Sequence, residues 1–194
     1  FTVVGAGRSG IAAANLLAAR GADVLLVEHT GRDKPDTVVP TVRYRAGTNT
    51  PRKGDCVVLS PGISEVSPVR KMVADLATEV LGEVELFSRL CPGTILAITG
   101  TDGKSTTTTM LGAICEATKR PTFVGGNLGN PLCEGLDDLG PESLVVAEIS
   151  AFQLTTCSRF RPRVAIVTNI AEDHVDYHGS FERYEASKRI IFEQ

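Results

Sequence analysis

A glycine-rich turn between a strand and a helix constrains this chain more than any other feature. The apolar residues 95–98 lead into Gly100-Thr101-Asp102-Gly103-Lys104-Ser105-Thr106, where we expect a helix to begin at Lys104. Glycines let backbone N–H groups turn toward an anion, and the helix N-terminus adds partial positive charge. Lys104 adds a full positive charge, and the hydroxyl of Ser105 can bind Mg²⁺. The usual pattern has a further glycine where Ile98 stands, so the sequence predicts a shortened phosphate loop that binds a nucleoside triphosphate.

A second glycine-rich turn lies near the start of the chain. An apolar strand at residues 1–4 precedes Gly5-Ala6-Gly7-Arg8-Ser9-Gly10, and a helix then runs to Arg20, with Gly21 as its C-terminal cap. The next strand ends on Glu28, which fits a dinucleotide-binding fingerprint. Any nucleoside diphosphate suits such a turn, including a UDP-sugar, and a plain structural turn has the same spacing. Two such turns in one chain favour an enzyme that couples ATP to a nucleotide-linked substrate.

Strand and helix patterns alternate along the chain and predict an α/β fold with parallel sheets. Residues 1–92 are expected to form a Rossmann-like domain, with later strands at 41–44 and 56–59 and a helix from Ser67. The pattern restarts after Cys91-Pro92-Gly93, so residues 93–194 are predicted to form a second α/β domain of the P-loop type. Its expected strands and last helix cover residues 95–99, 145–147, 164–167 and about 181–192. Both chain ends interrupt a pattern, which suggests a fragment that is truncated at its C-terminus.

The composition is ordinary for a soluble globular protein. Hydrophobic residues make up 42% of the chain and charged residues 22%, with a net charge of −3. This charge gives no reason to expect nucleic acid or a membrane as a partner, and no apolar run could span a bilayer. Five scattered cysteines without metal-binding spacing predict reduced thiols in a cytoplasmic protein. Since nothing indicates an obligate interface, we expect a monomer.

Several motifs in one order make the chain resemble a known family, the Mur ligases of peptidoglycan synthesis. The form Gly-Thr-x-Gly-Lys-Ser-Thr of the phosphate loop is typical of that family. Further matching segments are Gly125-Gly126-Asn127-Leu128-Gly129-Asn130-Pro131, Glu148-Ile149-Ser150-Ala151-Phe152-Gln153, Thr168-Asn169-Ile170-Ala171-Glu172-Asp173-His174 and Tyr184-Glu185-Ala186-Ser187-Lys188. Asp102 and Ala151 depart from the asparagine and serine that are usual there. The N-terminal loop, Ser60-Pro61-Gly62-Ile63 and residues 82–87 are similar to the member of the family that adds D-glutamate.

The resemblance implies an ATP- and Mg²⁺-dependent ligase that forms an amide bond. In the implied reaction the carboxylate of UDP-N-acetylmuramoyl-L-alanine attacks the γ-phosphate of ATP, and D-glutamate then displaces phosphate from the acyl phosphate. Bringing two anions together requires concentrated positive charge. The family has a third, C-terminal domain, so the 194-residue chain alone is expected to be inactive.

The resemblance also implies a role for particular residues. Lys104 and the loop residues 100–106 are expected to hold the phosphates of ATP, with Asn127 near the γ-phosphate or the substrate carboxyl. Catalytic or metal-binding roles fall to Lys104, Asn127, Ser105, Glu148, His174 and Lys188. Contacts to the UDP-linked substrate fall to Gly7, Arg8, Ser9, Glu28, His29, Gly62 and Asn127.

Lys188 lies in an apolar stripe at helical spacing with Phe181, Tyr184 and Ile191. Burial in such a stripe lowers the pKa of a lysine. The resemblance implies that the neutral amine then reacts with CO₂ to form a carbamate that binds Mg²⁺. The pattern alone favours a lysine that extends its charge past the stripe to water.

Three other functions are compatible with the sequence. The chain could belong to another Mur-type ligase or to a folylpolyglutamate-type ligase. It could be an NAD-binding module joined to a nucleotide-binding regulator, because the first glycine turn fits NAD as well. It could also be a binding module without catalysis. Binding of NAD, and not of the UDP-linked substrate, would favour the regulator.

Overall fold

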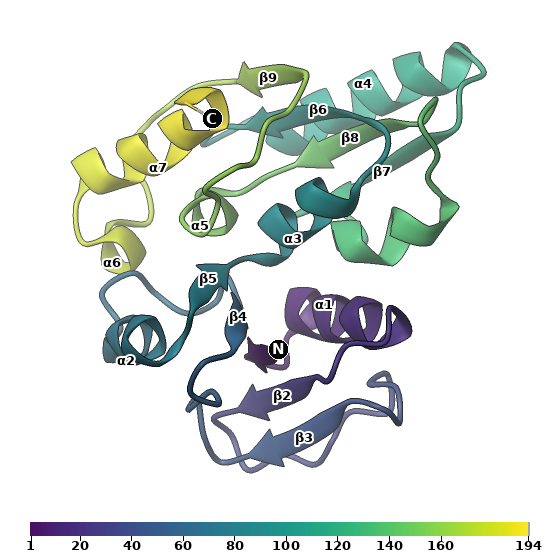
Figure 1. Cartoon of the computed structure of the whole chain (residues 1–194). Helices are drawn as coiled ribbons and strands as arrows, with labels where there is room; N and C mark the ends of the chain where they lie inside the picture. Colours follow the sequence, from purple (N-terminus) through teal and green to yellow (C-terminus); the bar gives the residue numbers. More distant parts are fainter. Residues whose placement is uncertain (194) are drawn as a thin grey trace.

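The structure, a computed structural model that describes residues 1–193, contains two parallel β-sheets that lie one above the other in Figure 1. The first has the strand order β3-β2-β1-β4-β5 and the second the order β7-β8-β6-β9. The first sheet consists of β1 (Thr2–Val4), β2 (Leu25–Glu28), β3 (Arg43–Ala46), β4 (Cys56–Leu59) and β5 (Glu79–Leu81). The second consists of β6 (Thr94–Thr99), β7 (Thr122–Gly126), β8 (Leu144–Glu148) and β9 (Val164–Val167). The predicted α/β fold with parallel sheets is confirmed.

Helices cover the sheets and connect them. The longer ones are α1 (Arg8–Ala19), α2 (Pro68–Leu76), α3 (Glu83–Leu90), α4 (Lys104–Ala117) and α7 (Phe181–Glu193). Three short ones, η1 (Leu132–Asp138), α5 (Ala151–Leu154) and α6 (Val175–His178), lie in the second half of the chain. Ser67 accepts a hydrogen bond from the backbone of Val69 and so caps α2, in agreement with the predicted helix start. The predicted starts of α4 at Lys104 and of the last helix after Ser180 are also confirmed.

The strands form where apolar runs can be buried on both faces of a parallel sheet. In β1 and β2 every residue is buried, and in β8 the five residues Leu144–Glu148 are buried as well. The strand β3 differs because it lies at the sheet edge and carries the polar sequence Arg-Tyr-Arg-Ala. These buried central strands deliver the loops at their carboxyl ends to one edge of each sheet.

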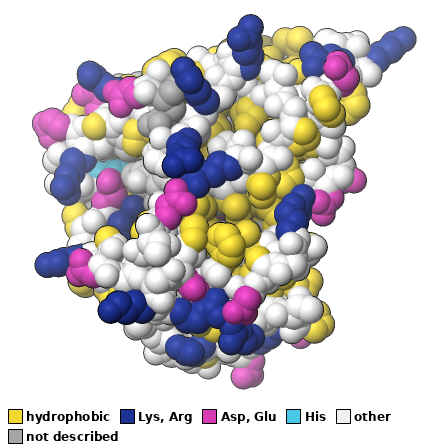
Figure 2. Space-filling view, in the orientation of Figure 1, with side chains coloured by type: hydrophobic (Ala, Val, Ile, Leu, Met, Phe, Trp, Pro, Cys, Tyr) yellow, Lys and Arg dark blue, Asp and Glu magenta, His cyan; other side chains and the backbone are white. Residues whose placement is uncertain are grey.

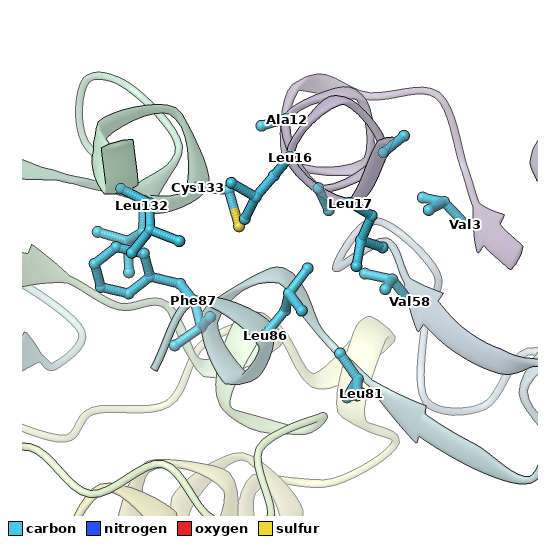
Figure 3. Close-up of a cluster of buried hydrophobic side chains, with 14 of the residues drawn as sticks. Val3, Ala12, Leu16, Leu17, Val58, Leu81, Leu86, Phe87, Leu132 and Cys133 are labelled. Atoms are coloured by element: carbon cyan, nitrogen blue, oxygen red, sulfur yellow. The ribbon is translucent and has the colours of Figure 1, made fainter. Parts of the chain in front are cut away.

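One continuous hydrophobic core joins the two halves of the chain. Figure 3 shows Leu16 of α1 beside Cys133 of η1 and Phe87 of α3 beside Leu132 of η1, while Leu17 of α1 points toward Val58 of β4; all belong to one cluster. The helix α3 therefore packs between the sheets rather than against one of them, which Figure 1 also shows. The division at residue 92 stays a prediction, since buried side chains on both sides of it share this core.

The prediction of a strand over residues 41–44 is wrong in its bounds. The strand β3 covers Arg43–Ala46, because its ladder to β2 pairs Arg43 with Leu25 and Ala46 with Glu28. Val42 is buried without belonging to the ladder, so its apolar character marks the core rather than the strand. The strands β5 and β7 have no counterpart in the sequence predictions.

The surface carries charges of both signs. On the face shown in Figure 2, Lys and Arg side chains are interspersed with Asp and Glu, and hydrophobic side chains show through at mid-height, where α1 and α3 lie in Figure 1. Among the described residues, no helix combines the length and apolar character that crossing a membrane requires.

Candidate active site

The phosphate loop connects β6 to α4 and packs tightly against the end of β9. Gly103 has a φ of +77°, and Gly100 has a φ of +147°. A Cβ atom on Gly100 would lie 1.9 Å from Oγ1 of Thr168. Both conformations favour glycine, and Gly100 also lacks room for a side chain. The sequence therefore folds here into a turn that places the first amides of α4, which have no partner within the helix, at the carboxyl edge of the sheet.

Residues after β9 hold this loop in place. Asn169 accepts the backbone N–H of Asp102 on Oδ1 at 3.0 Å, and its own carbonyl accepts the N–H of Thr101 at 3.1 Å. Thr168 donates its hydroxyl to the Asp102 carbonyl at 2.6 Å. The hydroxyls of Thr101 and Tyr184 lie 2.9 Å apart. Sequence reasoning gave no role to Thr168, Asn169 or Tyr184, although each lies in a motif that it singled out.

Two lysines converge on the carbonyl oxygen of Gly100. Nζ of Lys104 lies 2.9 Å from it and 2.6 Å from the Thr101 carbonyl, while Nζ of Lys188 lies 2.7 Å from the Gly100 carbonyl. Lys188 is only 1% exposed, and its ammonium lies 4.5 Å from the centre of the Tyr184 ring. Burial and the nearby charge of Lys104 lower the pKa of Lys188 to about 8. The alternative in which Lys188 extends to water is therefore wrong.

His174 lines the same pocket as these two lysines. A small pocket, here called the lysine pocket, is lined by Lys104, Lys188, His174, Asp173 and Phe152, together with Gly100, Ser150, Ala151 and Tyr184. The backbone of His174 has a φ of +52°, and its Nε2 lies 3.2 Å from Oδ2 of Asp173. Its ring centre is 4.7 Å from that of Phe152. The structure thus brings three of the predicted catalytic residues together around a space that can receive a negatively charged group.

Glu148 and Asn127 form a second pair at the carboxyl ends of β7 and β8. Oε1 of Glu148 accepts a hydrogen bond from Nδ2 of Asn127 at 2.7 Å. Glu148 is 1% exposed, and its Oε2 has no hydrogen-bond partner among the described residues. A buried carboxylate oxygen without a partner is costly, and a hard cation such as Mg²⁺ would compensate it. These residues therefore fit a divalent cation.

The predicted metal-binding residues do not all share one pocket. Ser105 and Thr106 line a separate hollow on α4 with Leu128. His174 and Lys188 line the lysine pocket, and Glu148 lies beside Asn127. Within residues 1–193, no group of three or more His, Cys, Asp or Glu side chains is arranged to hold a metal ion. The metal-binding roles stay predictions.

The first glycine loop is built around a buried carboxylate. A Cβ on Gly10 would lie 2.0 Å from the carbonyl oxygen of Gly5, so the turn is closed by backbone contact. Oε2 of Glu28 accepts the N–H of Ala6 at 2.8 Å, and Oε1 lies 2.9 Å from Nδ1 of His29. Although burial acts to raise it, hydrogen bonds from the Ala6 and Thr30 backbones hold the pKa of Glu28 below its usual value. Both carboxylate oxygens of Glu28 thus already have partners within the protein.

The remaining predicted residues line two adjoining hollows. The first hollow is formed by the glycine loop and the end of β2, and its lining includes Gly5, Gly7, Glu28, His29 and Gly62. The second, here called the interdomain hollow, has a volume of about 230 Å³ and is lined by Arg8, Ser9, Gly62, Asn127 and Phe152 among others.

These two hollows and the lysine pocket form a series. The first hollow and the interdomain hollow share Gly62, and the interdomain hollow and the lysine pocket share Ser150 and Phe152. The guanidinium of Arg8 donates to the carbonyl of Gly129 and so bridges the two halves of the chain. An extended ligand could therefore reach from the first glycine loop to the phosphate loop.

Comparison with known proteins assigns the chain to a family. Residues 98–194, half of the chain, match the Mur ligase middle domain. Residues 3–48 match an NAD(P)-binding Rossmann-like domain. The chain belongs to the Mur ligase family, as its motifs predict.

Similar curated proteins are named UDP-N-acetylmuramoylalanine--D-glutamate ligase. The one from Acidobacterium capsulatum is 43% identical over 198 residues, which cover 98% of this chain and 43% of the relative. The one from Pelotomaculum thermopropionicum is 42% identical over 200 residues, which cover 98% of this chain and 44% of the relative. The chain thus spans less than half the length of these relatives.

Solved structures confirm the fold. The UDP-N-acetylmuramate:L-alanyl-gamma-D-glutamyl-meso-diaminopimelate ligase from Neisseria meningitides superposes with a TM-score of 0.55 at 18% identity, over 100% of this chain and 68% of that one. A murein peptide ligase from Psychrobacter arcticus 273-4 gives a TM-score of 0.52 at 20% identity, over 98% of this chain and 46% of that one. Both superpositions extend over nearly the whole chain, so the fold with its two parallel sheets is shared with these solved ligases.

Proposed function

We propose that this chain carries the substrate- and ATP-binding parts of a ligase that joins D-glutamate to UDP-N-acetylmuramoyl-L-alanine in peptidoglycan synthesis. The series of pockets carries the proposal, because it connects a loop for a nucleotide-linked substrate with a loop for ATP. The 43% identity to a ligase of that name supports the choice of substrates. In this proposal the γ-phosphate of ATP and the substrate carboxylate meet beside the lysine pocket.

The positive charges of this pocket suit that meeting of anions. Lys104 and the first amides of α4 hold the β- and γ-phosphates. Lys188 and His174 line the same pocket, and Lys188 in its protonated form reduces the repulsion between phosphate and carboxylate. The amide of Asn127, held by Glu148 at 2.7 Å, orients the substrate carboxyl in the interdomain hollow.

Magnesium, when bound, supplies a Lewis acid that neutralises charge on the phosphates. Glu148, with its unpartnered Oε2, and Ser105 at the start of α4 would hold it, together with His174 and Lys188 of the lysine pocket. Because the pKa of Lys188 is lowered to about 8, part of this amine is neutral near physiological pH and can react with CO₂ to form a carbamate. All five cysteines are free thiols, which suits the proposed cytoplasmic location, and we propose a monomer.

A second candidate function is NAD binding, which the match of residues 3–48 favours. In a dinucleotide site an acidic residue at the position of Glu28 binds the ribose hydroxyls. Here both oxygens of Glu28 are already hydrogen-bonded to Ala6 and to Thr30 or His29. We therefore prefer the ligase function to NAD binding.

Calorimetric titration of this chain with UDP-N-acetylmuramoyl-L-alanine and, separately, with NAD distinguishes the two functions. We expect one molecule of the UDP-linked substrate to bind and NAD not to bind. Arg8→Gln should weaken the substrate about tenfold through the loss of one charged contact. Arg45→Gln is the matched control, since Arg45 is an exposed residue of β3 that lines none of the three pockets. Binding of NAD instead would contradict the proposed function.

A further inference from the structure

The short helix α6 of the second half contacts the loop that follows β4 in the first half, and α6 and α2 lie near each other in Figure 1. The hydroxyl of Tyr177 in α6 lies 2.7 Å from the carbonyl oxygen of Pro61 and 3.0 Å from that of Ile63. Arg70 of α2 donates to the same hydroxyl at 2.9 Å and to the Ile63 carbonyl at 3.0 Å. The phenol accepts from Arg70 and donates to a carbonyl, so its hydrogen-bonding capacity is used.

Two more contacts join the same segments. Ser64 donates its hydroxyl to the carbonyl of Tyr177 at 2.8 Å. Nδ1 of the next residue, His178, lies 2.5 Å from Oε2 of Glu65, and the imidazole is completely buried. We call Ser64, Glu65, Arg70, Tyr177 and His178 the interdomain clamp. None of these residues is needed to hold ATP or metal in the proposed function.

The interdomain clamp lies between two walls of the pocket series. Gly62, whose neighbours present their carbonyls to Tyr177, lines both the first hollow and the interdomain hollow. On its other side the Tyr177 ring packs on Phe152, with centres 4.1 Å apart. Phe152 lines the interdomain hollow and the lysine pocket. Tyr177 therefore connects a wall of the substrate hollows with a wall of the lysine pocket.

We propose that Tyr177 is a positioning residue for the UDP-linked substrate: its hydroxyl fixes the segment around Gly62 relative to Phe152 and the lysine pocket. This role rests on the proposed function, because it presumes that the substrate spans the three pockets. Without the hydroxyl, the carbonyls of Pro61 and Ile63 lose their shared partner across the interface. The loop then opens more often, and the substrate must bind to a site that is less often formed.

Tyr177→Phe tests this role, because it removes the hydroxyl and keeps the ring on Phe152. Hydrogen exchange is measured at Gly62, Ile63 and Ser67, whose N–H groups bond within the loop to Ser60 or Ser64. We expect exchange there to become about tenfold faster, with unchanged rates in β1 and β4. The dissociation constant of UDP-N-acetylmuramoyl-L-alanine should rise about tenfold, and that of Mg-ATP should stay the same.

Arg20→Gln is the matched control for the loss of any interdomain contact. Arg20, the residue directly after α1, forms an exposed ion pair with Asp137 of η1 at 2.8 Å and lines none of the three pockets. We expect it to change neither the loop exchange nor the binding of either ligand.

Three results would overturn the proposal in distinguishable ways. Unchanged loop exchange in Tyr177→Phe would show that the hydroxyl does not hold the segment. A parallel weakening of substrate and Mg-ATP binding, together with a lower melting temperature, would assign Tyr177 a structural role only. Failure of the wild-type chain to bind the substrate would overturn the proposed function and this role with it, even if loop exchange still depended on the hydroxyl.

Discussion

The two glycine loops of this chain share a strand–turn–helix setting but hold opposite charges. In the first, the carboxylate of Glu28 accepts the amide of Ala6 at 2.8 Å. In the second, Lys104 and Lys188 direct two ammonium groups at the carbonyl of Gly100. Each loop has a glycine that close packing requires: Gly10 packs against Gly5 in the first loop, and Gly100 packs against Thr168 in the second.

This difference shows what a glycine pattern does and does not specify. A concave set of N–H groups binds phosphate when no internal anion competes for it. The first loop uses one of its amides for Glu28 and forms a wall of the first hollow, whereas the second faces the lysine pocket with cations. The glycines determine the turn, and the charged residues around it determine the ligand.

The largest expected effect comes from filling the closed turn of the first loop. Gly10→Ala would place a Cβ 2.0 Å from the Gly5 carbonyl oxygen. We therefore expect the free energy of unfolding to fall by about 3 kcal/mol. Gly7→Ala is the matched control, because its Cβ would meet only Ser60 Oγ at 4.0 Å. Urea unfolding measures the stability of both variants. Midpoints equal to that of the wild-type chain in both would show that the loop tolerates a side chain at either position.

Removing the cation of the second loop should have the next largest effect. We expect Lys104→Met to raise the dissociation constant of Mg-ATP about 50-fold, equivalent to about 2.3 kcal/mol, and to leave the UDP-linked substrate unaffected. Lys119→Met removes an exposed lysine just after α4 and should change the dissociation constant of neither Mg-ATP nor the UDP-linked substrate. Titration calorimetry provides the comparison. Normal ATP affinity in Lys104→Met would show that this loop does not hold the phosphates.

The buried Lys188 should make stability depend on pH. Its folded pKa of about 8 lies below the usual 10.5, so between these values the unfolded chain binds more protons and stability rises with pH. From pH 7.5 to 9.5 the wild-type chain should gain about 2 kcal/mol relative to Lys188→Met. Urea midpoints of both proteins at the two pH values test this. Parallel pH profiles would mean that Lys188 is charged to the same extent in both states.

The smallest effect is expected for the carboxylate of the first loop. Glu28→Gln should lower the free energy of unfolding by about 1 kcal/mol at neutral pH, because the hydrogen bonds that the charged carboxylate accepts from Ala6 and Thr30 are weakened. Because the folded pKa of Glu28 is lowered, this contribution is present above its unfolded value of 4.5 and disappears as the pH falls. Glu116→Gln, at an exposed position of α4, is the control for thermal unfolding at pH 7 and pH 3. A loss that persists at pH 3 would exclude the charge as its cause.

Local sequence predicted the features that depend on local rules. Both glycine turns, the caps at Ser67 and Gly21 and the stripe of Tyr184, Lys188 and Ile191 were predictable, because each needs only a few neighbouring residues. The strand β7 was not, since it ends in Gly125-Gly126 and has only one buried residue. Glycine pairs usually indicate a loop. Here Gly126 is needed because a Cβ would lie 2.3 Å from the Glu148 carbonyl of the neighbouring strand.

The unpredicted part of the site depends on contacts between distant segments. Tyr177 meets Pro61 across 116 positions, and His178 meets Glu65 across 113, so neither spacing nor periodicity reveals them. No motif in the sequence singles out His178, which is one of the most buried polar residues. Glu28 was predicted to bind substrate, and that role stays a prediction beside its contact with Ala6.

The most direct test of the two-loop account is a titration of UDP-N-acetylmuramoyl-L-alanine into this chain already saturated with magnesium and a non-hydrolysable ATP analogue. If each loop serves its own ligand, one equivalent of the UDP-linked substrate binds, the analogue stays bound, and Lys104→Met loses only the analogue. Displacement of the analogue by the substrate would show that the two ligands compete for one site and would contradict the account.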